Sequence, residues 1–161
     1  MTPPGFQRRA PRLAALTLAV PGACGMASHA ATMPIDDTGT VTVQPTTNLR
    51  WQELSPRQRR GDLMEGSTQL RVRLNVKPWM GRSGRIYMVL PAQLPGDIAA
   101  SWTTTGRLLP GRVQSGSRTL VYSGAITAPV LEDTLVLSLS VDGRQMRQTY
   151  NLLFRFEIDE D

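Results

Sequence analysis

Strict alternation of apolar and polar residues is the dominant pattern along this chain. Between residues 70 and 77 every second residue is apolar, which predicts a strand with one side in a core: Leu70, Val72, Leu74 and Val76 alternate with Arg71, Arg73, Asn75 and Lys77. The segment Ile86–Leu90 is apolar on both faces and predicts a central strand. Short strands between Gly and Pro breaks favour an all-β fold, and we expect an antiparallel, immunoglobulin-like β-sandwich.

The end of the chain carries the longest alternating stretch. Residues 135–141 alternate, and Asp142-Gly143 follows, a dipeptide suited to a two-residue type I′ turn. This pattern predicts a hairpin whose return strand runs to the end of the chain. The apolar face of that return strand holds Met146, Tyr150, Leu152, Phe154, Phe156 and Ile158. We therefore expect it to be central to the core.

The first 30 residues have the pattern of a secretory signal peptide. Three arginines and no acid precede the apolar run Leu13–Val20, and the small residues Ser28 and Ala30 follow. The run is too short to span a bilayer, which needs roughly 20 apolar residues. We expect cleavage after Ala30 and export to the periplasm, the cell surface or the medium. A lipid-modified Cys24 or a twin-arginine signal are alternative export routes.

Removal of this leader would leave a chain without cysteine or histidine, because Cys24 and His29 are the only ones. Such a chain has no Cys or Ser nucleophile partnered by histidine, no disulfide, and no zinc, haem or iron–sulfur ligands of these types. We expect no cofactor and no metal. The mature chain would divide into an extension, 31–47, and a sandwich domain, 48–161, with no membrane span.

An enzyme would have to use carboxylates, and their spacing is unfavourable. The candidates are Glu132 and Asp133 together with Glu65 or Asp62. Adjacent residues on one strand point to opposite faces, so Glu132 and Asp133 make a poor acid–base pair. We therefore expect that the protein is not an enzyme.

The charge of the chain does not indicate a nucleic-acid site. The formal net charge is +5, with 18 basic and 13 acidic residues, but three of the arginines lie in the leader. Many of the others follow glycines in expected turns and are scattered along the sequence. We expect no nucleic-acid partner, since such sites gather their basic residues on one face.

The extension 31–47 carries a second, shorter alternating stripe. Met33, Ile35, Val41 and Val43 are apolar, and Asp37 and Gly39 interrupt them. A terminal stripe of this kind can add as a strand to the sheet edge of another molecule. The alternative is that it forms the first strand of its own sandwich.

Three aromatic residues are candidates for ligand contact. Trp79, Trp102 and Tyr87 could supply an aromatic platform for a sugar or a peptide. The alternative is that both tryptophans anchor the core. Trp79 stands out because it lies in an expected turn, between Pro78 and Met80.

The layout of leader, extension Met33–Val43 and C-terminal strand Tyr150–Ile158 resembles the pilin subunits of bacterial chaperone–usher fimbriae. The resemblance implies an incomplete immunoglobulin-like sandwich, whose missing strand is supplied first by a periplasmic chaperone and then by a neighbouring subunit. It implies that the donor strand is Met33, Ile35, Val41 and Val43. It implies that the acceptor core is Tyr150, Leu152, Phe154 and Phe156.

Two functions follow as expectations. The first is an exported structural or adhesive subunit of a surface pilus, assembled by strand exchange with other pilin-like subunits. The second is a self-contained periplasmic or secreted β-sandwich module that binds a sugar or a peptide.

Overall fold

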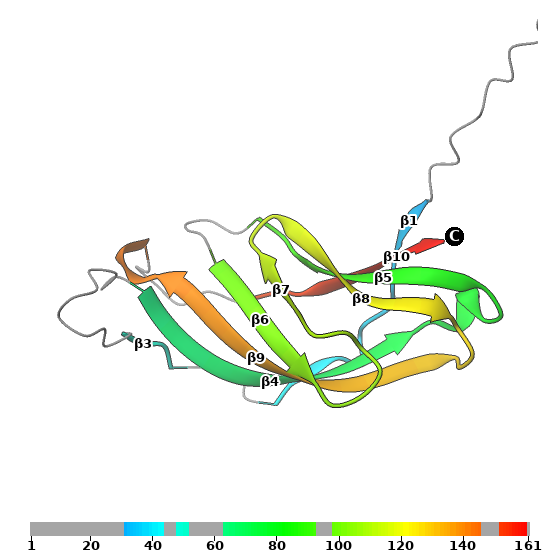
Figure 1. Cartoon of the computed structure of the whole chain (residues 1–161), viewed down its shortest axis with the longest axis horizontal. Coiled ribbons are helices and arrows are strands. Elements are labelled where there is room, and N and C mark those ends of the chain that lie inside the picture. The colour runs from blue at the N-terminus through cyan, green and yellow to red at the C-terminus, as the bar shows by residue number, and fades with distance from the viewer. Residues whose placement is uncertain (1–30, 44–47, 52–62, 93–97, 146–151, 161) are drawn as a thin grey trace, which may run out of the picture.

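Two antiparallel sheets build the protein. The computed structural model describes residues 31–43, 48–51, 63–92, 98–145 and 152–160 (Figure 1). Sheet A has the strand order β1 (Thr32–Pro34), β10 (Arg155–Glu160), β5 (Ser83–Leu90) and β8 (Ser117–Ala125). Sheet B has the order β2 (Val41–Thr42), β4 (Leu63–Asn75), β9 (Val130–Asp142), β6 (Ile98–Thr104) and β7 (Gly111–Gln114), with β3 (Arg50–Trp51) also paired to β4. The expected all-β fold is confirmed.

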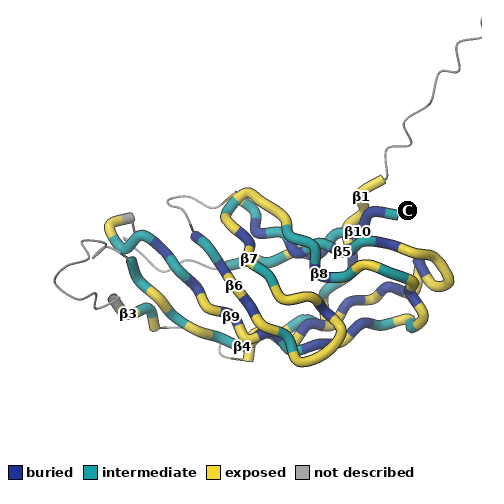
Figure 2. The backbone as a smooth tube through the Cα atoms, in the orientation of Figure 1, coloured by how far each residue is buried: buried dark blue, intermediate teal, exposed yellow. Residues whose placement is uncertain are grey.

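Alternation along the strands places one face of each sheet in a shared core (Figure 2). On β4, Leu70, Val72 and Leu74 are buried while the residues between them are exposed. On β5, Ile86 and Met88 have no exposed surface. Burying a side chain of this size contributes about 1.5–3 kcal/mol before the entropy cost of ordering is subtracted. The core therefore follows directly from the period-2 pattern.

The predicted C-terminal hairpin is wrong. β9 pairs with β4 and β6 in sheet B, whereas β10 pairs with β5 and β1 in sheet A. Asp142 and Gly143 do not make a two-residue turn, because a 3-10 helix, η2 (Gly143–Gln145), begins there. The Asp142 carboxylate accepts the Arg144 N–H at 3.0 Å, a local bond that supports this turn. Both edges of β9 are already paired, so β10 completes the other sheet.

The two sheets are linked differently along their two sides. On one side, β7 of sheet B continues into β8 of sheet A through a turn at Gly116, whose φ of 78° suits glycine. The Leu109 N–H donates to the Val121 carbonyl there at 2.7 Å. On the other side, the N-terminal segment crosses from sheet A to sheet B. That crossing forms the candidate site described below.

Helical structure is sparse in the described residues. Besides η2, there is one 3-10 helix, η1 (Lys77–Trp79), between β4 and β5. No helix within the described ranges is long and apolar enough to cross a membrane. The predicted leader, residues 1–30, lies outside these ranges.

Candidate functional site

The N-terminal segment changes sheets over a short distance. β1 pairs antiparallel with β10, from Thr32 opposite Asp159 to Pro34 opposite Glu157. The Ile35 N–H then donates to the Phe156 carbonyl at 2.9 Å. The chain next reaches sheet B, where β2 pairs with β4. The segment thus closes one side of the molecule within its own chain (Figure 1).

The expected single stripe is therefore divided between two surfaces. Met33 and Ile35 lie on the core side of sheet A, where Ile35 is only 5% exposed but Met33 is 37% exposed. Val41 and Val43 are each 49% exposed on the outside of sheet B. The prediction that these four residues share one face is wrong, because the chain turns between them.

The turn lies where acid and glycine interrupt the stripe. The Thr40 N–H donates to the Asp37 carbonyl at 2.8 Å. The Asp36 carboxylate accepts the Thr38 hydroxyl and N–H, which lowers the pKa of Asp36. Burial has the opposite effect on the next residue and raises the pKa of Asp37. These interruptions of the apolar pattern mark the position of the sheet change.

Of the predicted acceptor residues, Phe156 lies next to this segment, because its carbonyl accepts the Ile35 N–H. Phe156 is fully buried, while Leu152 and Phe154 are half-buried against the same core. Tyr150 lies outside the described residues. Within the described part of the chain, the β1-facing edge of β10 has no strand partner before Phe156. The N-terminal segment therefore covers only part of this edge, and donation of the segment to a neighbour remains a prediction.

A buried carboxylate fastens β1 to sheet A. The Asp159 side chain is 9% exposed and accepts the Thr32 hydroxyl at 2.6 Å. Two guanidinium nitrogens of Arg118 donate to its two oxygens, each at 3.2 Å. Arg118 crosses β5 to make this contact and lies 4.3 Å from the centre of the Tyr87 ring. One cluster thus joins all four strands of sheet A.

The hydrogen bonds of this cluster hold Asp159 in its charged form. The bond from Thr32 lowers the pKa of Asp159 most, Arg118 lowers it further, and desolvation opposes both. The bond to Asp159 in turn raises the pKa of Arg118. No local pattern in the sequence indicates this pairing, because Asp159 stands beside two further acidic residues, Glu160 and Asp161. Arg118 lies two strands away, and only the strand order brings them together.

The aromatic candidates do not form one platform. Trp79 and Trp102 are 6% and 4% exposed, so both indoles pack in the core. The Trp102 Nε1–H donates to the Leu109 carbonyl at 3.0 Å and helps close the β7–β8 side. Tyr87 lies on the opposite, outer face of sheet A under Arg118. The structure thus places the two tryptophans as core anchors.

The carboxylates considered for catalysis are also separated. Glu132 is exposed and bridges Arg73 at 3.1 Å, while Asp133 is buried on the other face of β9. Arg73 is the strand partner of Glu132, and Glu65 lies eight residues before Arg73 on β4. At about 3.3 Å per residue, Glu65 is roughly 26 Å along the strand from the position of Glu132. Asp62 lies outside the described residues. The expected divergence of Glu132 and Asp133 is confirmed.

Asp133 has a structural environment. Its carboxylate accepts the Leu108 N–H at 2.8 Å and the Thr134 N–H at 2.6 Å. The Thr105 hydroxyl approaches it at 3.4 Å. Asp133 therefore holds the loop between β6 and β7 against β9.

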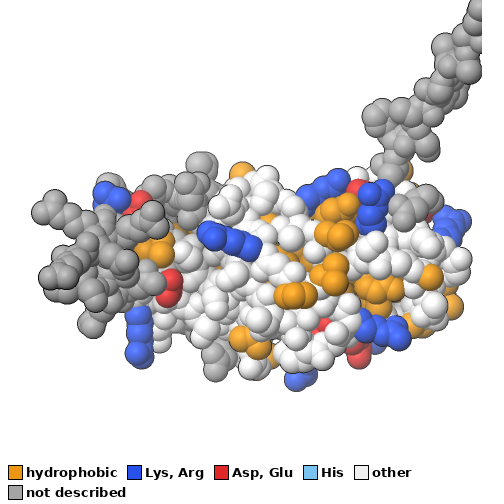
Figure 3. All heavy atoms as spheres, viewed as in Figure 1, with side chains coloured by type: hydrophobic (Ala, Val, Ile, Leu, Met, Phe, Trp, Pro, Cys, Tyr) orange, Lys and Arg blue, Asp and Glu red, His pale blue; other side chains and the backbone are white. Residues whose placement is uncertain are grey.

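Among the described residues, no group of three His, Cys, Asp or Glu side chains could hold a metal ion. Basic side chains are scattered over the face in Figure 3 and do not form one patch.

No family model, no characterised protein and no solved structure matches the chain.

Proposed function

We propose that this chain is an exported structural subunit of a surface pilus, assembled by exchange of its N-terminal strand with other pilin-like subunits. The observation that carries the proposal is the way β1 is held. β1 is the first strand in the described part of the chain and lies at a sheet edge, and three residue pairs join it to β10, whereas six join β10 to β5. Ile35 is the only buried residue of the segment 31–43.

A strand with these properties can leave its place and be replaced by an identical one. Exchange of a terminal element between copies requires no threading of the chain and restores the same contacts. An incoming strand would pair with β10 and extend toward Leu152 and Phe154, whose half-buried side chains lie beyond the reach of β1. Backbone pairing supplies affinity in such an addition, and alternate side-chain pockets supply specificity.

The resemblance to chaperone–usher pilins implies a fold, a compartment and a chaperone for such a subunit. The fold would be an immunoglobulin-like sandwich, and the predicted leader would direct it to the periplasm. A periplasmic chaperone would protect the edge of β10 before assembly. A role of this kind needs no catalytic centre, which agrees with the divergent carboxylates described above.

Removal of the segment 31–43 tests the proposal. The shortened chain should lose thermal stability, because Ile35 and the β1 pairs are missing. A synthetic peptide spanning Met33–Pro45 should restore the melting temperature in trans. A matched peptide carrying Ile35→Asp should not, because the charge would enter the core. If neither peptide restores stability, the strand is not exchangeable and the pilus proposal fails.

The second candidate function is a self-contained periplasmic or secreted binding module. The observation that favours it is the pairing of β1 within its own chain, with Ile35 already in the core. A module of this kind should stay monomeric at all concentrations, whereas a strand-exchanging subunit should form oligomers as concentration rises. Size-exclusion chromatography with light scattering separates the two candidates.

A further inference from the structure

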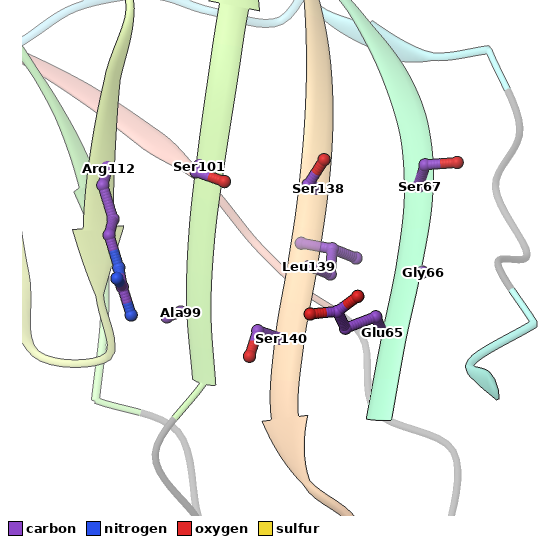
Figure 4. A pocket seen from close by; sticks show the side chains of 9 residues that line it. All are labelled: Glu65, Gly66, Ser67, Ala99, Ser101, Arg112, Ser138, Leu139 and Ser140. Carbon is purple, nitrogen blue, oxygen red and sulfur yellow. The ribbon is translucent and has the colours of Figure 1, made fainter. Parts of the chain in front are cut away.

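A polar trough crosses the outer face of sheet B. It has a volume of about 510 Å³ and lies over β4, β9, β6 and β7 (Figure 4). The polar side chains that line it are Glu65, Ser67, Ser101, Arg112, Ser138 and Ser140. The inward-facing neighbours of these residues form the core, so the trough lies outside the segment and strand edge discussed above.

The strand register explains the shape of the trough. Ser67, Ser138, Ser101 and Arg112 lie directly opposite one another on four successive strands. In the next row along the strands, Ser140 lies between Glu65 and Ala99. Short side chains in both rows leave the sheet surface low, and the three serines on β9 and β6 present hydroxyl groups along it. The floor is thus made of groups that both donate and accept hydrogen bonds.

The two charged side chains that line the trough, Arg112 and Glu65, lie on different strands. Arg112 lies on β7 with its side chain extended along the strand toward the level of Ala99 (Figure 4). Within the described residues its guanidinium has no hydrogen-bond or ion-pair partner, and its backbone carbonyl is fixed by the Thr119 hydroxyl at 2.6 Å. Glu65 lies on β4, whose backbone is three strand spacings or roughly 14 Å from that of β7, and its side chain points toward Ser140 on β9 (Figure 4). One end is therefore cationic and the other anionic.

The size and charge of the side chains that line the trough favour one class of ligand over the others. A protein partner would need apolar or aromatic anchors, and the trough lining contains none larger than Leu139. A nucleic acid would need several cations, but only one arginine is present and Glu65 would repel a polyanion. A small hydroxylated ligand with a single negative group fits both the serine floor and Arg112.

We propose that the trough binds a saccharide that carries one carboxylate. The carboxylate would pair with the two-pronged guanidinium of Arg112, and sugar hydroxyls would bond the hydroxyls of Ser101, Ser138 and Ser140. The span across four strands accommodates more than one sugar ring. The proposal is independent of strand exchange, because it uses the outer face of sheet B and none of the contacts of β1.

NMR titration of the purified, isotope-labelled chain tests this proposal with 3′-sialyllactose and cellobiouronate, which carry one carboxylate each, and with uncharged lactose as probes. We expect at least one acidic sugar to shift the amide signals of Ser101, Arg112 and Ser138, with affinity at least tenfold higher than that of lactose. Arg112→Met should abolish this preference. Arg71→Met is the matched control, because Arg71 is exposed on the same face but outside the trough. Ser138→Val should weaken binding further by filling the floor.

Each result of the NMR titration either supports or overturns the saccharide proposal. The proposal is overturned if neither acidic sugar shifts these signals, if lactose binds equally well, or if Arg71→Met weakens binding as much as Arg112→Met. Arg112→Met should leave rescue by the N-terminal peptide unchanged. Failure of the sugar proposal is therefore distinguishable from failure of the pilus proposal.

Discussion

Two aspartates show how single residues hold this structure together. Asp133 and Asp159 are the buried polar residues among those described, and each accepts hydrogen bonds from groups on other elements. A buried carboxylate is tolerated only when such donors replace the lost water. Both residues therefore report on long-range contacts, and each leads to a prediction.

Asp133→Ala should cost about 2–4 kcal/mol of unfolding free energy. The buried Leu108 N–H and the part-buried Thr134 N–H would both lose their acceptor. The neighbouring Glu132→Ala is the matched control and should cost at most about 1 kcal/mol, because its ion pair with Arg73 is exposed. Urea melts of both variants give the comparison. Equal losses would show that the Asp133 contacts do not anchor the loop.

Asp159 should make the stability of the protein depend on acid pH. Its pKa is lower in the folded state than the ordinary value of 3.8, so its stabilising effect is fully present above that value. The effect is lost as the pH falls below 3.8 through the folded pKa. Asp159→Asn should lower stability at neutral pH by roughly 1.5–3 kcal/mol, the range for hydrogen bonds to charged groups.

Denaturant melts from pH 7 to pH 2 test this expectation. Asp159→Asn should flatten the loss below pH 3.8 relative to the wild-type chain. Asp36→Asn is a suitable comparison, because Asp36 also has a lowered pKa but lies on the exposed turn. An unchanged acid profile for Asp159→Asn would contradict the role of the cluster.

At the scale of elements, β10 shows how far the alternating pattern extends. Phe156 and Ile158 are buried as the pattern predicts, and Arg155 is exposed between the phenylalanines. Phe154 precedes the strand and is only half-buried. The expected equivalence of the two phenylalanines in the core is therefore not what the structure shows.

Phe156→Ala should cost about 3–5 kcal/mol, the range for an aromatic side chain removed from a core. Phe154→Ala should cost less, about 1–2 kcal/mol, because less apolar surface returns to water. Arg155→Ala should change stability by less than about 0.5 kcal/mol. Thermal or urea unfolding of the three variants checks the order, and similar losses for all three would contradict the assigned faces.

The alternation of apolar and polar residues predicted the positions of the strands better than it predicted which strands pair. The strands around Leu70 and Ile86 could be recognised from neighbouring residues alone. A strand buried on one face alternates apolar and polar residues, and a strand buried on both faces is continuously apolar. The hairpin after Asp142 and the undivided N-terminal stripe were wrong, because turn residues do not reveal which sheet the chain enters next. The Asp159 cluster and the serine trough depend on register across several strands, which no local window contains.

At the scale of the whole molecule, the two proposed surfaces lie apart. The N-terminal segment closes the side of the molecule between β10 and β4, whereas the trough lies on the outside of β4, β9, β6 and β7. A neighbour that exchanged β1 would meet sheet A at β10. The outer face of sheet B could then bind its ligand in every copy of an assembly.

We expect the pairing of β1 with β10 to form late in folding. Thr32 and Asp159 are separated by 127 residues, so the first strand in the described part of the chain pairs with the last one described. Contacts of such long separation close large loops and form slowly. β4, β5, β8 and β9 can already pair while β10 is still being made. We therefore expect β1 to dock after the other described strands, on a domain that is otherwise nearly complete.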